Sequence, residues 1–382
     1  MTLNGATITL YTYGDALLEA SGSGFDPSYC TGIKCADGIT ITSTDITITS
    51  TGLTGKGISS DADINIYSGN ITITSTGNGS TYTNSEGVTD SYNSTCITAD
   101  GNINIIGGAI TTTSSGTAGK GISSDAALTI GDDSNSPTIS ITTQGSKIYV
   151  YGSGSDISYA EAKGISCDGA ITINNGSITI SSADDGIKSK TSVTFNNGTT
   201  SIIKSVEGIE APYITVNDGY ISVAASDDGF NATKGNGGET NDGSCLYLYG
   251  GTVNVNVTGG DGLDSNGNIV MTGGTVVVQG PPPSPEVGLD YNGTFNISGG
   301  LLIASGPNSG NMIQTVSSTS PQRAVKVTMS SLLTTSTLFH IQDSQGSSLV
   351  TFKPVRNVYY IVFSSSDLAN GSTYSIYTGG HL

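Results

Sequence analysis

The chain has 382 residues, of which 54 are glycine and none is tryptophan, and only 12% are charged. Its net charge of −18 argues against binding to nucleic acid or to anionic membrane surfaces, which require basic patches. Apolar residues alternate with Thr and Asn in many short runs, a pattern that excludes a disordered chain and indicates an all-β protein. No apolar run is long enough for a transmembrane helix.

The first thirty residues are the least regular part of the chain. Residues 3–13 alternate like a β-strand, and residues 15–20 could form one helical turn. A β-helix has open strand edges at its ends that must be covered. The segment is therefore expected to be either an N-terminal cap or an incomplete first coil.

From residue 31 onward, short Ile-x-Ile triplets recur, as in Ile39-Thr40-Ile41, Ile64-Asn65-Ile66 and Ile171-Thr172-Ile173. In each triplet the two isoleucines point to one face of a strand and the middle residue points to the other. One coil cannot bury its own isoleucines, so successive coils must stack. The pattern predicts an all-β, right-handed parallel β-helix of roughly ten coils over residues 1–315.

Three stretches interrupt this repeat, at residues 77–95, 132–162 and 233–245. They are predicted to be loops that project from the coils and could wall a groove. Exposed tyrosines can stack on sugar rings, although packing on the surface is the alternative for each of them. The tyrosines in these stretches include Tyr82, Tyr92, Tyr149, Tyr151 and Tyr159.

A short motif recurs through residues 184–290: an acidic residue, then glycine, then an apolar residue. We call this motif the acidic phrase. Its glycines, Gly186, Gly208, Gly229, Gly262 and Gly288, follow one another at intervals of 22, 21, 33 and 26 residues. Repeats of about twenty-two residues are too short for propeller blades or helical arrays, but they fit one coil of a β-helix. The residue before the glycine is Lys56, Lys120 and Lys163 in earlier coils, where lysine is interpreted as an ordinary spacing charge.

The acidic phrase predicts a metal site. Equivalent positions of stacked coils lie about 4.8 Å apart, and two ionised carboxylates at that distance would repel by about 3 kcal/mol at an effective dielectric constant of about 20. Either some pKa values rise or a cation binds between the coils, and oxygen ligands from several coils suit Ca²⁺. A solvated acidic face is the alternative. The predicted calcium ligands are Asp184, Asp185, Glu207, Glu210, Asp227, Asp228, Asp261 and Asp264.

After the proline-rich residues 281–285, the repeat continues for two less regular coils, and the sequence pattern changes at residue 324. Residues 321–382 are predicted to be a small antiparallel β module that caps the end of the β-helix. The five cysteines match no zinc pattern. Burial as small apolar residues is expected for Cys35 and Cys167, and a disulfide between Cys30 and Cys35 is the alternative.

The order of the acidic phrases resembles a known family. The motifs are Asp184-Asp185-Gly186-Ile187, Glu207-Gly208-Ile209-Glu210, Asp227-Asp228-Gly229-Phe230-Asn231, Gly260-Asp261-Gly262-Leu263-Asp264, Gly273-Gly274-Thr275-Val276 and the ending Thr373-Tyr374-Ser375-Ile376-Tyr377. They are similar to those of the pectate-lyase-like, right-handed β-helix carbohydrate-binding proteins of plant-fibre-degrading and gut anaerobes. The resemblance implies secreted or cell-surface proteins that bind calcium and acidic or cellulosic plant polysaccharides, with the acidic pairs as calcium ligands.

Three functions follow as hypotheses. The first is a calcium-containing protein that binds a polysaccharide, with Lys188, Asn231 and Asp290 as carbohydrate-binding residues. The second is a polysaccharide lyase, which needs a base such as Lys188, Lys190 or Lys204 to remove a proton that Ca²⁺ has acidified. The third is a structural or adhesive β-helix. We expect a monomer that inserts into no membrane, and secretion although no signal peptide is evident at Met1.

Overall fold

The computed structural model describes residues 1–154, 157–235, 238, 240–380. By their contacts these residues divide into two compact units, Met1–Val206 and Glu207–Leu382. Over the described residues both units consist of β-strands and connections, with one short 3₁₀-helix, η1 (Gly310–Met312), in the second unit. The fold is a parallel β-helix with a small antiparallel β module at the C-terminus.

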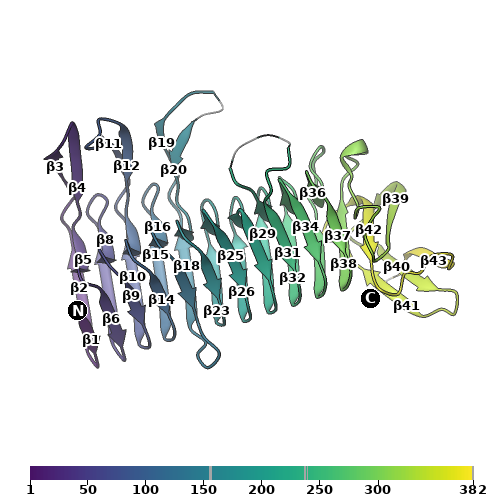
Figure 1. Cartoon of the computed structure of the whole chain (residues 1–382), viewed down its shortest axis with the longest axis horizontal. Helices are drawn as coiled ribbons and strands as arrows, with labels where there is room; N and C mark the ends of the chain where they lie inside the picture. Colours follow the sequence, from purple (N-terminus) through teal and green to yellow (C-terminus); the bar gives the residue numbers. More distant parts are fainter. Residues whose placement is uncertain (155–156, 236–237, 239, 381–382) are drawn as a thin grey trace. The chain divides into compact units, whose positions relative to one another are not determined.

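The first unit stacks its coils into three parallel sheets (Figure 1). The first sheet contains β1 (Thr2–Asn4), β6 (Ile39–Thr42), β9 (Ile64–Ile66), β14 (Ile103–Ile105), β17 (Leu128–Ile130), β22 (Ile171–Ile173) and β25 (Ser192–Phe195). The second contains β2 (Thr7–Thr12), β7 (Asp45–Ser50), β10 (Asn70–Ser75), β15 (Ala109–Ser114), β18 (Thr138–Thr143), β23 (Ser177–Ser181) and β26 (Thr199–Lys204). The third contains β5 (Thr31–Cys35), β8 (Lys56–Ser60), β13 (Thr95–Ala99), β16 (Lys120–Ser124), β21 (Ile165–Cys167) and β24 (Ile187–Ser189).

The isoleucine triplets form the core of this unit, as their alternation predicts. Ile41, Ile66 and Ile105 are fully buried and lie in register on adjacent strands. Burial of such a side chain contributes about 1.5–3 kcal/mol, and every coil adds several. Glycine is required at the corner after β9, where Gly69 has φ +110° and a Cβ atom would lie 2.2 Å from Thr44 O.

Three antiparallel hairpins project from the coils of the first unit on one side (Figure 1). They are β3 (Leu17–Ser21) with β4 (Gly24–Ser28), β11 (Ser80–Thr83) with β12 (Thr89–Tyr92), and β19 (Ile148–Tyr151) with β20 (Ser158–Ala160). The predicted helical turn at residues 15–20 is therefore wrong, because Leu17–Ser21 pairs with Gly24–Ser28 around a turn at Gly22. Strands β1 and β2 pair with β6 and β7 and so belong to a first coil.

The predicted excursion at residues 132–162 is only partly correct. It contains β18, whose Ile139-Ser140-Ile141 is a regular triplet in register with β15 and β23. The hairpin β19–β20 follows it, and residues 155–156 of the excursion lie outside the described residues. All five cysteines are free, so the alternative of a disulfide between Cys30 and Cys35 is wrong.

The second unit repeats the three-sheet coil. Its first sheet contains β28 (Tyr213–Val216), β31 (Cys245–Leu248), β34 (Asn268–Met271) and β37 (Phe295–Ile297). Its second contains β29 (Tyr220–Ala225), β32 (Thr252–Val257), β35 (Thr275–Gln279) and β38 (Leu301–Gly306). Its third contains β27 (Ile209–Ala211), β30 (Phe230–Ala232), β33 (Leu263–Ser265) and β36 (Leu289–Tyr291).

The C-terminal module ends the second unit. Strands β42 (Val358–Ser364) and β39 (Ala324–Leu333) continue the second sheet beyond β38, now antiparallel. A separate antiparallel sheet consists of β41 (Ser348–Phe352), β40 (Leu338–Asp343) and β43 (Tyr374–Gly379). Phe339, Phe352 and Phe363 lie in one buried cluster between them, which also contacts Ile303 of β38. The division of the chain into residues 1–315 and 321–382 stays a prediction.

Candidate functional site: acidic coils and a lysine clamp

A buried lysine holds three carboxylates together in the first unit. The Lys163 Nζ atom lies 2.6 Å from Glu161 Oε2, 2.9 Å from Asp184 Oδ2 and 2.5 Å from Asp185 Oδ2. Lys163 and Asp185 occupy the same position on adjacent coils, since Gly164 N donates to Asp185 O at 3.0 Å. We call Glu161, Lys163, Asp184 and Asp185 the lysine clamp.

The clamp is charged, and its centre is buried. The side chains of Lys163 and Asp185 are 9% and 5% exposed. Burial by itself lowers the pKa of Lys163, but the carboxylates of Asp185, Asp184 and Glu161 outweigh it and raise the pKa well above its usual value. Burial likewise raises the pKa of Asp184, and Lys163 reverses this effect and lowers it. The ammonium group therefore remains protonated at any physiological pH.

The other lysines near the clamp also pair with acids. Lys188 Nζ lies 3.5 Å from Asp185 Oδ2, and Lys190 Nζ lies 2.7 Å from Asp168 Oδ2. Lys188 thus lies beside the acids, as the sequence pattern predicts, but in the position of a counter-charge.

In the second unit, the acidic residues that directly precede the repeat glycines lie on successive coils and form a column. Asp228 Oδ1 accepts a hydrogen bond from Asp261 N, and Asp261 Oδ1 accepts one from Val287 N, each at 2.5 Å. Each carboxylate therefore binds the backbone of the following coil. This is a structural role that the repeat does not reveal.

The carboxyl groups of Asp228 and Asp261 both have raised pKa values. Burial raises the pKa of Asp228 to about 7 despite the hydrogen bond from Asp261 N, and the carboxylates of Asp227, Glu286 and Asp290 add to the rise. Burial raises the pKa of Asp261 to about 8 for the same reasons. Protonation therefore relieves part of the repulsion that the sequence predicts, and a bound cation would relieve it in the same way.

A second polar column lies two residues beyond the glycines. Glu210, Asn231, Asp264 and Asp290 occupy equivalent positions on β27, β30, β33 and β36. The Oδ1 atom of Asn231 is buried and has no hydrogen-bond partner. Gln314 Nε2 donates to Asp290 Oδ1 at 2.5 Å. The predicted carbohydrate-binding residues Asn231 and Asp290 thus share one column with two of the predicted calcium ligands.

The predicted ligands are divided along the chain between the two units. Asp184 and Asp185 belong to the clamp of the first unit. Glu207, Glu210, Asp227, Asp228, Asp261 and Asp264 belong to the second unit, where Asp227 is exposed and Asp261 is buried. The loop predicted at residues 233–245 includes residues 236–237 and 239, which lie outside the described residues.

Three residues that contribute to these groups are absent from the sequence-based prediction. Glu161 and Lys163 complete the clamp. Glu286 acts on the pKa of both Asp228 and Asp261. A signal existed for two of them: Lys163 stands in the column that becomes acidic at Asp185, and Glu286 lies two residues before a glycine, like Asp184 and Asp227.

The residues fit a metal ion to different degrees. Carboxylate oxygens of Glu161, Asp184 and Asp185 lie within 4.8 Å of one another and could hold an ion, but the Lys163 ammonium group already bonds to all three. In the second unit the unpartnered Asn231 oxygen lies between the positions of Glu210 and Asp264. Amide and carboxylate oxygens are the ligands that Ca²⁺ prefers.

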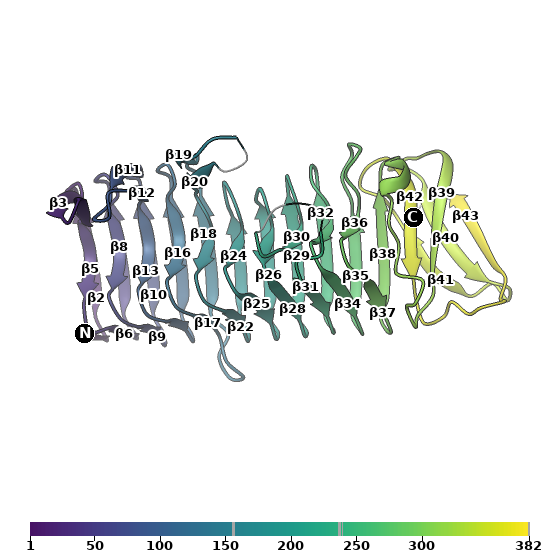
Figure 2. The ribbon, with the colours of Figure 1, turned by 45° about the horizontal axis from the view of Figure 1, so that its top comes forward.

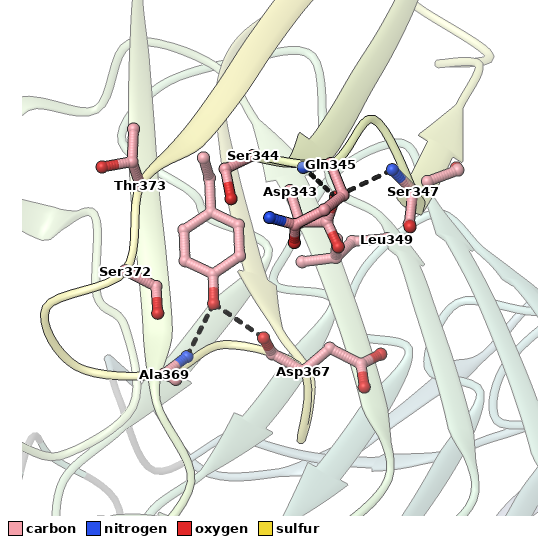
Figure 3. Close-up of a pocket in the computed structure, with 11 residues that line it drawn as sticks. Asp343, Ser344, Gln345, Ser347, Leu349, Asp367, Ala369, Ser372 and Thr373 are labelled. Carbon is pink, nitrogen blue, oxygen red and sulfur yellow. Dashed lines mark hydrogen bonds between the residues drawn. The ribbon is translucent and has the colours of Figure 1, made fainter.

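The C-terminal module has a separate hollow of about 490 Å³ (Figure 3). Asp343, Gln345, Asp367 and Tyr374 are among the residues that line it. The Tyr374 hydroxyl group donates to Asp367 O at 2.7 Å and accepts from Ala369 N at 2.8 Å. Asp343 Oδ1 accepts from two amides of its own turn. These hydrogen bonds hold the walls of the hollow in place, and they join groups of the C-terminal module to one another.

These features define a parallel β-helix protein in which polar side chains of stacked coils form long, regular surfaces. The chain belongs to the carbohydrate-binding domain-containing protein family, whose model matches residues 2–208. The match covers nearly the same residues as the first unit. No curated protein and no solved structure matches the chain. In the part of the chain that the structure describes, no helix has the length and apolar character needed to cross a membrane.

Proposed function

We propose that the protein binds an acidic plant polysaccharide of the polygalacturonate type through Ca²⁺, without cleaving it, outside the cell or at the cell surface. The membership in a carbohydrate-binding family carries the binding part of this proposal. Calcium, the acidic ligand and the location go beyond the family and rest on the chemistry of the second unit.

The calcium part rests on the oxygen atoms around Asn231. A buried amide oxygen without a partner costs free energy unless a ligand or a cation satisfies it. Glu210 and Asp264 occupy the positions next to Asn231 on the two neighbouring strands. These residues would hold the ion, and the ion would supply a positive charge to a ligand carboxylate.

The net charge of the protein makes the cation necessary for an acidic ligand. A protein with a charge of −18 repels a polyanion at long range. A bound Ca²⁺ reverses the local charge and can bridge two carboxylates. Salt screens the long-range repulsion but affects a direct bridge much less.

The lysines argue against a lyase. The base of such an enzyme must be able to lose its proton near neutral pH. Lys163 is held protonated by three carboxylates, and Lys188 Nζ lies 3.5 Å from Asp185 Oδ2. The proposal is therefore binding alone.

Chelation should lower the melting temperature of the protein. An ion that binds only the folded state stabilises it by an amount that depends on the ratio of free ion to Kd, about 2.7 kcal/mol at a hundredfold excess. Calorimetry with 2 mM EDTA, then with excess Ca²⁺, tests this expectation. An unchanged melting temperature, with no metal detected by elemental analysis, would remove calcium from the proposal.

Polygalacturonate binding should depend on the second unit. Substitution of Asn231 by Ala together with Asp264 by Asn should weaken binding in affinity electrophoresis by about tenfold or more, since both remove ion ligands. Asp218→Asn, an exposed aspartate of the same unit, is the matched control and should bind normally. EDTA should reduce binding more steeply than NaCl does.

Cleavage is tested in the same samples. The absorbance near the unsaturated-uronate band should stay flat when polygalacturonate and Ca²⁺ are incubated with the protein. A steady rise that disappears in Lys188→Ala would show a lyase and contradict the proposal.

A further inference from the structure

Two strands of the third sheet in the first unit begin with a lysine. Strands β8 and β16 start at Lys56 and Lys120, and each lysine ends a corner of the form Gly-x-x-Gly-Lys. Strand β13 lies between them, and its Thr95 is in register with both lysines. Two strand spacings, about 9.6 Å, therefore separate the two positions. We call Lys56 and Lys120 the corner lysines.

The corner lysines alternate with the projecting hairpins of the first unit. The hairpins precede β5, β13 and β21, whereas β8 and β16 lie between these strands in the sheet and follow tight corners (Figure 2). The link from the first hairpin to β5 contributes Tyr29, and the Lys56 Nζ atom lies 3.6 Å from the centroid of its ring. The ammonium group of Lys56 is therefore bordered by an aromatic ring.

The corner lysines differ from the other lysines of this sheet because they have no acidic partner. Six of the 13 lysine and arginine residues of the chain lie in the third sheet or directly beside its strands. Four of the six have a carboxylate oxygen within 3.5 Å of the Nζ atom, namely Lys34, Lys163, Lys188 and Lys190. Among the described residues, Lys56 and Lys120 form no ion pair.

Both corner lysines are half-buried, and their acidity reflects it. Burial lowers the pKa of Lys56 to about 8. Burial also lowers the pKa of Lys120, and the charge of Lys163 adds to this effect. For Lys163 itself, burial acts in the same direction, but three carboxylates outweigh it and raise the pKa. A partly desolvated cation without a counter-charge is unfavourable, so an anionic ligand would stabilise both corner lysines.

Hydroxyl groups follow the corner lysines along the same strands. Ser59, Thr98 and Ser123 occupy equivalent positions on β8, β13 and β16. Within the described part of the chain, these three hydroxyl groups have no hydrogen-bond partner in the protein. A sulfate ester presents three terminal oxygens, which can accept hydrogen bonds from an ammonium group and from hydroxyl groups together. A carboxylate presents only two oxygens, in one plane.

We propose that Lys56 and Lys120 bind sulfate ester groups of a sulfated polysaccharide that runs along the third sheet of the first unit. The family match carries the saccharide part, since it covers residues 2–208 and so includes both lysines. This inference rests on the carbohydrate-binding part of the proposed function, but it uses the other unit and other residues, and it requires no Ca²⁺.

A sulfated chain fits the corner lysines in charge and in spacing. A sulfate ester is a strong acid and stays ionised, so its charge favours the protonated form of a lysine whose pKa is lowered by burial. The separation of about 9.6 Å is close to the length of two extended sugar residues. One chain can therefore place esters of alternate sugars at Lys56 and Lys120. The net charge of −18 repels a polyanion at long range, so both contacts must act on the same chain.

The test is affinity electrophoresis of the full chain in dextran sulfate, in the presence of EDTA, with uncharged dextran as the reference polymer. Lys56→Met with Lys120→Met should weaken binding by about tenfold or more, because each contact is a charge-assisted hydrogen bond. The control is Lys34→Met with Lys190→Met, which removes the same two charges from the same sheet at exposed lysines that pair with aspartates. It should bind like the native protein. Equal loss in both pairs, or no loss in either, would overturn the inference.

The melting temperature separates a binding role from a structural one. It should stay the same or rise in Lys56→Met with Lys120→Met, because the change removes two unpaired charges from half-buried positions. A marked fall would show that the corner lysines hold the coils together, and it would overturn the inference. Dextran sulfate binding in EDTA is measured without polygalacturonate or Ca²⁺, so this inference and the proposed function fail separately.

Binding of dextran sulfate should weaken as pH rises from about 7 to about 9.5, because only the protonated form of the lysine binds. The sulfate ester does not titrate in this range, whereas Lys56 loses its proton above a pKa of about 8. Burial raises the pKa of Tyr29, so its ring stays neutral. The groups that face Lys56 are Tyr29, Lys34, Asp100, Lys120 and Asp125.

Arginine variants complete the test. Lys56→Arg with Lys120→Arg stays charged at every pH used, so it should bind dextran sulfate equally at pH 7 and 9.5. A flat pH profile for the native protein would overturn the inference. Polygalacturonate binding in EDTA that the methionine pair abolishes would assign the corner lysines to carboxylates and overturn the sulfate assignment. Cleavage of polygalacturonate that disappears in Lys56→Met would make Lys56 a catalytic base and overturn the binding role.

Discussion

Lys163→Met should destabilise the first unit by about 3–5 kcal/mol, because it leaves Glu161, Asp184 and Asp185 as a buried cluster of uncompensated negative charge. Methionine keeps the length and apolar stem of lysine, so the loss measures the missing charge rather than a cavity. Calorimetry of native and variant protein in EDTA would measure it. Retention of the native melting temperature would show that the clamp carries no net stability.

The matched control for this variant is Lys190→Met. Lys190 pairs with Asp168, but the two side chains are 69% and 45% exposed. Pairs of this kind contribute about 0–1 kcal/mol. A second measurement tests the three carboxylates of the clamp. When the ammonium group is removed, their oxygen atoms lie within 4.8 Å of one another and could hold an ion. Millimolar Ca²⁺ should therefore raise the melting temperature of Lys163→Met more than that of the native protein.

The stability of the second unit should fall as pH rises from about 4 to about 8 in the absence of Ca²⁺. Folding raises the pKa of Asp228 to about 7 and that of Asp261 to about 8. The folded state therefore binds more protons than the unfolded state between pH 4 and 8, so the free energy of unfolding decreases with pH. One pKa unit corresponds to about 1.4 kcal/mol. We expect a loss of at least about 2 kcal/mol after allowing for screening by solvent.

Melting curves at pH 5, 6.5 and 8 in EDTA would measure this trend. Asp228→Asn with Asp261→Asn should flatten it, because each amide keeps the Oδ1 acceptor for the backbone and no longer titrates. Asp218→Asn should leave it unchanged. A stability that rises over this pH range in EDTA would contradict the assigned acidities. Ca²⁺ should also flatten the trend, since the cation replaces the protons.

The coils could be predicted from sequence because one force determines them. Ile39-Thr40-Ile41 and its repeats specify which side chains face inward, and burial of isoleucine dominates the energy of each coil. Residues 15–20 could not be predicted, since Leu17–Ser21 forms a hairpin strand that buries little and depends on its partner strand. The strand at Ile139–Ile141 lies inside a predicted loop, although its alternation is regular and it pairs in register with its neighbours.

The candidate site was predictable as a set of columns but not as a set of contacts. The register places Glu210, Asn231 and Asp264 on adjacent strands, as the spacing of the glycines requires. The partner of Asp185 depends on where a flexible lysine side chain points, which no repeat encodes.

The stacking of the first unit has an evolutionary consequence. A coil contacts only its immediate neighbours, so duplication or loss of one coil leaves the packing of the others intact. Each such event would add or remove one row of outward residues while the spacing between rows stays the same. The length of the outer faces therefore changes with repeat number, through recombination between similar segments, without any change in the residues of a single coil.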